Sequence, residues 1–511
     1  MRKTILKFTS RARMALLVGA IALAGLTTAF SDRGEGDIIA KAAPVRLVVD
    51  DSVPNRDGHF TTSFSPVVKK VAPSVVKVEV SGAAKMDDAP ELPLNDPFFR
   101  RFFGEQFDGR QFRRGQPTPR QRGLGSGVIV TKDGYILTNN HVVDGADEVK
   151  VVLTDRREYT AKVVGKDPKT DIAVLKIDAK DLPFLPLANS DKIEIGDIAL
   201  AVGNPFGIGQ TVTMGIISAT SRGNVGVGVD YEDFIQTDAS INPGNSGGAL
   251  VDAEGRLIGI NTAILSRTGG NQGIGFAVPV NLARNVMESL IKEGRVVRGY
   301  IGVGIQDLTP ALAEQFRVKE ATGALVSEVK ADAPAAKAGL ETGDVIVEWN
   351  GKPVRDSRQL KLQVSQTLPG EKATVKVLRE GRNKTFSITP KELPGSEVAM
   401  NSGSGSNSDS ETLKGVSVGD IDTLAKSQLK LPDSVKGALV TAVDPNSAAY
   451  EAGLREGDVI QEINRKPVKN AGEAIAISEK LKGGTTLLRV WSNGGSHFVA
   501  VKEGPGKGKL G

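Results

Sequence analysis

The sequence predicts a mainly β protein with several domains, and three observations lead to this prediction. The chain has 511 residues, which is too many for one hydrophobic core. Glycine is abundant, at 59 residues, and aromatic residues make up only 5%, which favours loop-rich β structure over helical bundles. A 32-residue block also occurs twice in the C-terminal third, which indicates two copies of one small domain.

The N-terminus has the features of an export signal. Five basic residues lie within the first 13 positions. An apolar run of 13 residues then extends from Met14 to Leu26, and small residues follow to Ala29. This length is typical of a signal peptide and is short for a membrane span. We therefore expect a signal peptide over residues 1–29. An uncleaved anchor reaching Phe30 is the alternative, and peripheral membrane association also stays open.

Charge and composition exclude several function classes. The five basic leader residues account for the whole formal net charge of +5, so the remaining chain is neutral and nucleic-acid binding is not indicated. The absence of cysteine excludes disulfides, thiolate chemistry and cysteine-based zinc sites, and three histidines leave little room for other metal sites. No GxxxxGK[ST] motif is present, so we expect no nucleotide. We expect no metal and no cofactor.

The region over residues 65–294 follows a flexible segment, expected over 30–64, and is rich in short, glycine-punctuated strands. Five of these strands are expected over 126–130, 135–138, 148–153, 172–177 and 198–202. Strands at this spacing indicate a barrel or a sandwich. A closing helix is expected over 281–292, ending at Gly294.

An insertion over residues 96–123 interrupts this β-rich region. It holds six of the 17 phenylalanines, interleaved with seven arginines. One interpretation is a disordered loop with a partly sticky surface. The other is an interaction loop that docks on another subunit or on a substrate.

The repeated block covers residues 323–354 and 437–468, with 18 of 32 positions identical. The two copies define domains over 298–391 and 414–503. A linker over 392–413, rich in serine and glycine, separates them, and residues 504–511 form a tail.

Ser246 is the strongest candidate for a nucleophile. It lies in the turn Gly244-Asn-Ser-Gly-Gly248, where glycines let neighbouring N–H groups converge and leave the hydroxyl uncovered. An acyl-transfer nucleophile needs such N–H groups aimed at the developing oxyanion. Taken alone, the motif also fits a tight hairpin.

A general base and its orienting carboxylate complete the arrangement. Of the three histidines, only His141 shares a domain with Ser246, because His59 lies in the polar leader and His497 in a late strand. The carboxylate is assigned to Asp171, at the start of an apolar strand. Its rivals, Asp144 and Asp167, lie in polar turns. The order His, Asp, Ser matches the chymotrypsin arrangement.

At these residues the sequence resembles the HtrA (Deg) family of serine proteases, from Ser65 to Lys502. TNNHVV around His141, TDIAVLKI around Asp171 and GNSGGAL around Ser246 match the family motifs. The resemblance implies a chymotrypsin-like double β-barrel protease followed by two α+β PDZ domains. It also implies a periplasmic endopeptidase that needs no ATP and cleaves unfolded or misfolded exported proteins after small aliphatic residues. Homotrimers or multiples of trimers, a stress role and chaperone activity are implied as well.

The resemblance also implies functions for residues near Ser246. The amides of Gly244 and Ser246 would form the oxyanion hole, and Pro243 stands where relatives often carry a basic residue. Ile241 and Ile264 would line the specificity pocket, and 262–264 would offer backbone to the substrate strand. The implied substrate-binding residues are Ile241, Gly244, Asn245, Thr262, Ala263 and Ile264.

The two repeats resemble PDZ domains, which bind an extended C-terminal peptide as an added strand. In the first repeat, the carboxylate loop would comprise Tyr300, Ile301, Gly302 and Val303. In the second, Lys414 replaces Ile301. That domain therefore fits a spacer or assembly module at least as well as a peptide-binding groove.

Three hypotheses for the whole chain remain: an endopeptidase, a chaperone with a protease relic, and a PDZ scaffold. A relic would have lost a member of the triad, and none is lost. A scaffold would not keep the Ser246 turn together with His141 and Asp171. The sequence therefore favours the endopeptidase.

Overall fold

The computed structural model describes residues 45–56, 63–82, 121–204, 209–266, 270–394, 411–432, 435–481 and 483–502. The expected signal peptide and C-terminal tail lie outside these residues, as does the phenylalanine-rich insertion apart from its last three positions. Most of the expected linker over 392–413 also lies outside them. Within the described part of the chain, no helix combines the length and apolarity that a membrane crossing requires.

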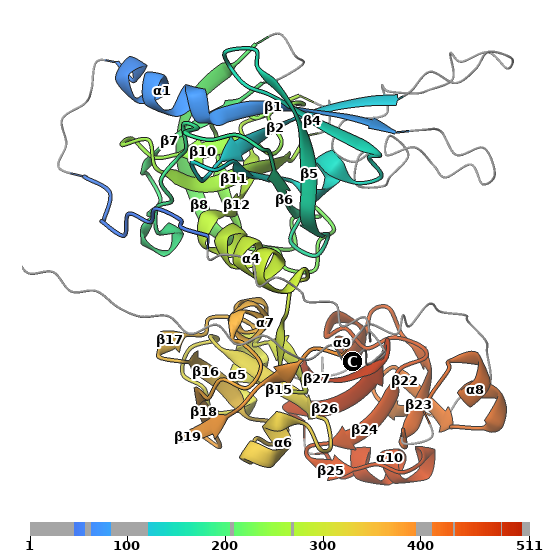
Figure 1. Cartoon of the computed structure of the whole chain (residues 1–511). Helices are drawn as coiled ribbons and strands as arrows, with labels where there is room; N and C mark the ends of the chain where they lie inside the picture. Colours follow the sequence, from blue (N-terminus) through green and yellow to red (C-terminus); the bar gives the residue numbers. More distant parts are fainter. Residues whose placement is uncertain are drawn as a thin grey trace, which may run out of the picture. The chain divides into compact units, whose positions relative to one another are not determined.

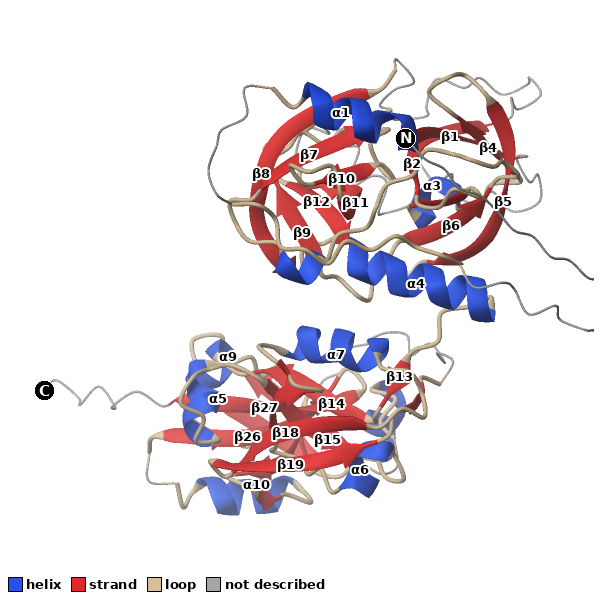
Figure 2. Ribbon diagram, turned by 60° about the vertical axis from the view of Figure 1, so that its left-hand side comes forward, coloured by secondary structure: helices blue, strands red, loops and turns tan. Residues whose placement is uncertain are grey.

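Two closed six-stranded barrels form the first half of the described chain (Figure 2). This confirms the predicted double β-barrel. The first barrel has the strand order β1-β2-β3-β6-β5-β4. Its strands are β1 (Val75–Gly82), β2 (Gln121–Ile129), β3 (Tyr135–Thr138), β4 (Glu148–Val152), β5 (Glu158–Asp167) and β6 (Ile172–Lys176).

The second barrel has the order β10-β11-β12-β9-β8-β7. Its strands are β7 (Ile198–Gly203), β8 (Thr211–Arg222), β9 (Phe234–Thr237), β10 (Ala249–Val251), β11 (Leu257–Ile264) and β12 (Gly275–Pro279). All eight residues of β11 are buried, and the helix that follows the second barrel packs on this strand. The rings of Phe234 and Phe276 pack at 5.9 Å in the barrel core.

Short helices connect and close the barrels. They are α1 (Ser65–Val71), η1 (Ala72–Ser74), α3 (Asn140–Val143), η3 (Ser190–Lys192) and α4 (Val280–Glu293). The helix α4 packs on strands of both barrels and lies along them in Figure 2. It ends at Gly294, whose φ of 70° and N–H bond to the carbonyl of Leu290 form a left-handed C-cap. The helix predicted over 281–292 is therefore present.

The first PDZ domain holds a sheet in the order β14-β15-β16-β18-β19, with β17 beside β16, and a separate pair β13-β20 (Figure 1). Its strands are β13 (Gly299–Tyr300), β14 (Val303–Asp307), β15 (Ala324–Val329), β16 (Val345–Trp349), β17 (Lys352–Pro353), β18 (Ala373–Arg379), β19 (Arg382–Ile388) and β20 (Lys391–Glu392). Its helices are α5 (Pro310–Gln315), α6 (Pro334–Ala338) and α7 (Ser357–Gln366).

The second PDZ domain repeats this plan in the order β21-β22-β23-β24-β26-β27, with β25 beside β24. Its strands are β21 (Glu411–Leu413), β22 (Val416–Asp420), β23 (Ala438–Val443), β24 (Val459–Ile463), β25 (Lys466–Pro467), β26 (Thr485–Ser492) and β27 (Gly495–Lys502). Its helices are α8 (Thr423–Gln428), α9 (Ala448–Glu451) and α10 (Ala471–Ser478).

Candidate active site

The three predicted catalytic residues come from different elements of the two barrels. His141 lies in α3, where its buried neighbours Val142 and Val143 anchor the helix in the first barrel. Asp171 immediately precedes β6 of the same barrel. Ser246 lies in the turn between β9 and β10 of the second barrel.

His141 and Asp171 are joined by two hydrogen bonds. The Nδ1 atom of the ring lies 2.7 Å from Asp171 Oδ2, and the His141 N–H donates to Asp171 Oδ1 at 3.0 Å. The Asp171 side chain is only 4% exposed, so water does not compete for these bonds. A carboxylate at Nδ1 favours the tautomer in which Nδ1 carries the proton and the unprotonated Nε2 can act as a base. This is the arrangement that the predicted role of Asp171 as the orienting carboxylate requires.

The two rival carboxylates have other partners. Asp144 is exposed and pairs with Lys166 Nζ at 2.6 Å. Asp167 is buried, but its Oδ2 accepts a hydrogen bond from Thr170 Oγ1 at 2.5 Å and pairs with Arg298 at 2.5 Å. This buried ion pair stabilises the loop that precedes Asp171.

Ser246 is buried, and its hydroxyl donates a long hydrogen bond of 3.3 Å to the carbonyl of Thr262. The turn that carries it requires left-handed glycines, with φ of 95° at Gly244 and 82° at Gly247. These are conformations that only glycine adopts readily. The sequence-based argument from the glycines of this turn therefore agrees with its geometry.

The backbone N–H groups of this turn divide into two sets. Those of Asn245, Gly247 and Gly248 donate to carbonyls within the protein, at 2.8–2.9 Å. Among the described residues, none accepts a hydrogen bond from the N–H of Gly244 or of Ser246. Because buried N–H groups are nearly always satisfied, two such groups beside a serine hydroxyl can bind an oxyanion.

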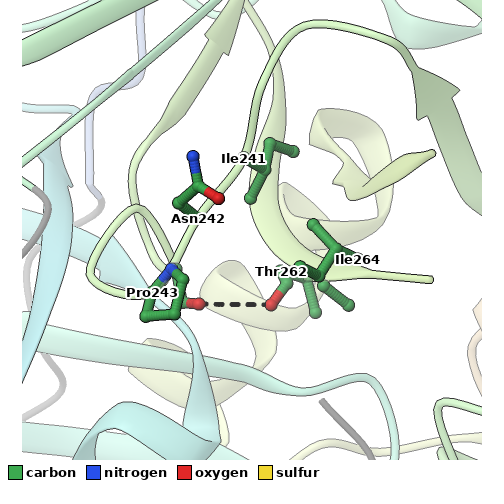
Figure 3. A pocket seen from close by; sticks show the side chains of 7 residues that line it. Ile241, Asn242, Pro243, Thr262 and Ile264 are labelled. Atoms are coloured by element: carbon green, nitrogen blue, oxygen red, sulfur yellow. Dashed lines mark hydrogen bonds between the residues drawn. The ribbon is translucent and has the colours of Figure 1, made fainter. Parts of the chain in front are cut away.

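A small pocket opens beside Ser246 (Figure 3). The side chains of Ile241 and Ile264 supply apolar surface there. A Cβ atom at Gly275 would approach Ile241 Cδ1 to 2.9 Å, so a larger residue at this position would require the Ile241 side chain to move. The lining residues are Ile241, Asn242, Pro243, Ser246, Thr262, Ala263 and Ile264.

One edge of β11 lies next to the pocket and can accept a strand. The pairing of β10 with β11 ends at Ile260, whereas β11 continues to Ile264 on its pairing with β12. The backbone from Thr262 onward thus has no strand partner on the β10 side within the described chain. An extended segment added there would place its side chains next to the pocket.

Asn139 is a supporting residue that the sequence analysis did not identify. It is fully buried, and its Nδ2 group donates to the carbonyl of Asp171 and to Thr262 Oγ1, both at 2.9 Å. It thereby links the loop that carries Asp171 to the strand β11. The available signal was an asparagine pair directly before His141 at the end of an apolar strand.

The predicted carboxylate loop of the first PDZ domain is a tight turn around Gly302, which has a φ of 77°. The carbonyls of Ile301 and Gly302 accept hydrogen bonds from Ala335 and Lys330, both at 2.9 Å. The Ile301 side chain is 3% exposed and belongs to the domain core. Any contact from Ile301 to a peptide would therefore come from its backbone.

Models of known protein families match three parts of the chain. A model of the trypsin-like peptidase domain matches residues 125–260. Models of the PDZ domain match residues 299–389 and 439–492.

Curated relatives cover most of the chain. A probable periplasmic serine endoprotease, DegP-like, from Chlamydia trachomatis serovar D is 41% identical over 457 residues, which cover 87% of this chain and 89% of the relative. Proteins of the same description from Brucella suis biovar 1 and Pseudomonas putida strain F1 are 42% and 40% identical. The Brucella match covers 86% of this chain and 89% of that protein, and the Pseudomonas match covers 86% and 92%.

Solved structures of the same family match about two thirds of the chain. The HtrA-type protease AlgW with a tripeptide is 46% identical and has a TM-score of 0.52, covering 66% of this chain and 99% of that one. The same protease with a decapeptide is 50% identical with a TM-score of 0.50, covering 66% and 100%.

Proposed function

This chain belongs to the HtrA-type, DegP-like family of serine endoproteases, and on that premise we propose that Ser246, His141 and Asp171 hydrolyse peptide bonds in unfolded exported proteins. The chain is a serine endopeptidase with a trypsin-like peptidase domain and two PDZ domains. The proposal concerns which residues act, on which substrates, and where.

The observation that carries the proposal is the pair of N–H groups, of Gly244 and Ser246, that have no acceptor among the described residues and lie in the same domain as the His141–Asp171 pair. Ser246 Oγ attacks the scissile carbonyl while His141 takes its proton. Asp171 stabilises the imidazolium that forms. The N–H groups of Gly244 and Ser246 stabilise the oxyanion, and His141 then protonates the leaving amine.

Substrate recognition follows from the pocket and the strand edge. Residues 262–264 bind the substrate backbone as an added strand, and the pocket between Ile241 and Ile264 takes a small aliphatic side chain. The protease therefore cleaves after small aliphatic residues. Unfolded chains present such extended segments along their whole length, which supports misfolded proteins as the substrate class.

The remaining parts of the proposal concern the cell and the assembly. The relatives are described as periplasmic, which supports a periplasmic location and a role in protein quality control under stress. The first PDZ domain holds C-terminal peptides of substrates, and chaperone activity accompanies proteolysis. A homotrimer, or a multiple of it, covers exposed apolar side chains of the second barrel, among them Ile195, Met214 and Ile216.

The test combines chemical labelling with mutation. A fluorophosphonate should modify the wild-type protein on Ser246, located by mass spectrometry of the digest. Ser246→Ala should lose labelling and casein cleavage by several orders of magnitude while its melting temperature stays unchanged. Cleavage of casein by Ser246→Ala at a comparable rate would show that the nucleophile is another residue. Cleavage sites without a preference for small aliphatic residues would contradict the assignment of the pocket.

A further inference from the structure

Ser126, in β2 of the first barrel, contacts the Ser246 turn of the second barrel at two points. Its N–H donates to the carbonyl of Ser246 at 2.8 Å, and its hydroxyl donates to the carbonyl of Gly244 at 2.6 Å. The same hydroxyl accepts a hydrogen bond from the N–H of Asn204 at 2.9 Å. Ser126 is completely buried, so no water can replace these partners.

The position of Ser126 is itself fixed. Thr138 Oγ1 donates to the Ser126 carbonyl at 2.7 Å. A Cβ atom at Gly125 would approach the side chain of Val142 to 2.6 Å, and one at Gly127 would approach Ile136 to 2.8 Å. The backbone therefore packs closely against its neighbours on both sides of the serine.

The two carbonyls that accept hydrogen bonds from Ser126 belong to Gly244 and Ser246, whose N–H groups have no acceptor in the part of the chain that the structure describes. The peptide unit after Gly244 is held at both ends, since the Asn245 N–H also donates to the carbonyl of Asn242 at 2.9 Å. The unit after Ser246 is held likewise, because the Gly247 N–H donates to Asn261 at 2.8 Å. Fixing these units restricts the rotations that aim the free N–H groups.

We propose that Ser126 is a positioning residue that orients the oxyanion hole from the opposite barrel. The inference rests on the proposed function of Gly244 and Ser246. It assigns to the first barrel a part in binding the oxyanion, in addition to carrying His141 and Asp171. Preorganised donors are effective because they need not reorient during the reaction. Losing one anchor therefore reduces the stabilisation of the transition state more than it reduces the binding of the substrate.

The experiment compares Ser126→Ala with Ser74→Ala in the full-length protein. Ser74 is also fully buried, and its hydroxyl has no partner among the described residues, so its loss controls for the removal of a buried oxygen. Kinetics with a short peptide carrying an aliphatic P1 residue give kcat and KM. The inhibition constant of a peptide boronate reports binding of a tetrahedral adduct in the oxyanion hole.

Ser126→Ala should lower kcat by about ten- to a hundred-fold, which is less than the loss caused by removing an oxyanion donor itself. KM should change by less than about two-fold, and the boronate should bind more weakly by the same factor as kcat/KM falls. Ser74→Ala should match the wild type in all three. Full kcat and boronate affinity in a folded Ser126→Ala protein would overturn the proposal.

A second variant decides the case in which Ser126→Ala does not fold. Ser126→Cys keeps the volume close to that of serine and retains a weak donor, so its kcat and boronate affinity should fall together by a smaller factor. Wild-type values for this variant would overturn the proposal. The Ser246→Ala variant separates a failure of the proposed function from a failure of this inference. If Ser246→Ala still cleaves peptides, the proposed function is wrong. If Ser246→Ala is inactive and Ser126→Ala is unaffected, only the inference about Ser126 is wrong.

Discussion

At the scale of single residues, the conformation of Asp171 explains how one carboxylate makes both bonds to His141. Its φ of 58° is left-handed, a region that aspartate and asparagine tolerate better than other side chains. This conformation directs Oδ1 to the His141 N–H and Oδ2 to the ring. Backbone geometry and charge are thus separate requirements at this position.

Asp171→Asn separates the two requirements. Asparagine keeps the left-handed conformation, and its oxygen can still accept the His141 N–H. Its amide group would donate to Nδ1, which forces the ring into the tautomer that cannot take a proton from Ser246. We expect kcat to fall about 10⁴-fold, with a melting temperature close to that of the wild type. A modest loss of kcat would show that Asp171 does not set the tautomer.

Gly247→Ala tests the steric requirement of the nucleophile turn. Gly247 has a φ of 82°, and a Cβ atom there would lie 2.1 Å from the carbonyl oxygen of Ser126. Gly145→Ala is the matched control, because Gly145 is also left-handed, at 67°, but its Cβ atom would meet nothing within 4 Å. The control should lose about 1 kcal/mol of stability and no activity. Gly247→Ala should lose more stability and nearly all cleavage, and equal effects of both variants would contradict the clash.

At the scale of elements, the sequence analysis succeeded where the signal is local. The five strands and the closing helix follow from alternation and glycine punctuation, and the structure contains all six. His141, Asp171 and Ser246 each stand in a short motif that carries its own chemistry. Their mutual distances could not be predicted from the residues, because they depend on how two closed barrels pack.

The contacts between the two barrels could not be predicted from the sequence around the residues that make them. Ser126 appears in the sequence as one polar residue in an apolar strand, and its partners Asn204 and Gly244 lie 78 and 118 positions away. The end of the β10 pairing at Ile260, which leaves the strand edge open, depends on register as well. Register is set by tertiary packing and turn geometry rather than by the composition of one strand.

The second PDZ domain provides a prediction at this scale. The strand β22 pairs on its outer side with β21, with Leu413 opposite Val416 and Glu411 opposite Ser417. In the first domain, the corresponding β13 pairs with β20, and β14 ends its sheet within the described residues. A peptide could join β22 only by displacing β21, whose Leu413 is buried in the domain core.

We therefore expect the full-length Ser246→Ala protein to bind one peptide with a free apolar C-terminus per chain. Titration calorimetry gives this stoichiometry directly. The same peptide with an amidated C-terminus should bind far more weakly, because the loop around Gly302 would hold a carboxylate. Two equivalent sites per chain would show that β21 does not close the second groove.

At the scale of the whole molecule, the two PDZ domains share a hydrophobic cluster that the sequence analysis did not predict. The rings of Phe316 and Phe498 meet edge to face at 5.1 Å. The Gln306 amide accepts from the Phe498 N–H at 2.6 Å and donates to its carbonyl at 3.0 Å. The polar composition of the linker indicated independent domains, but a linker's composition does not report which sheet faces remain to be covered.

The first PDZ domain should raise the rate at which long substrates are cleaved. A substrate whose C-terminus is bound in that domain is tethered, so its effective concentration at Ser246 is set by the reach of the unfolded chain and can approach the millimolar range. A long unfolded substrate with a free apolar C-terminus should therefore be cleaved faster, at low concentration, than the same chain with an amidated C-terminus. A short peptide that reaches only the pocket should be cleaved equally in both forms.

The matched pair of substrates avoids mutating the carboxylate loop, which matters because Ile301 is part of the domain core and its replacement by lysine would unfold the domain. An excess of a short competitor with a free apolar C-terminus separates two mechanisms. Under tethering alone, it should slow cleavage of the long substrate and leave the short peptide unaffected. If a peptide bound in the first PDZ domain also shifts the loops around Ser246, the competitor should accelerate cleavage of the short peptide. The acceleration cannot exceed the factor by which the competitor binds the active arrangement more tightly than the inactive one. Equal rates for the free and amidated long substrates would show that the first PDZ domain does not deliver substrate to Ser246.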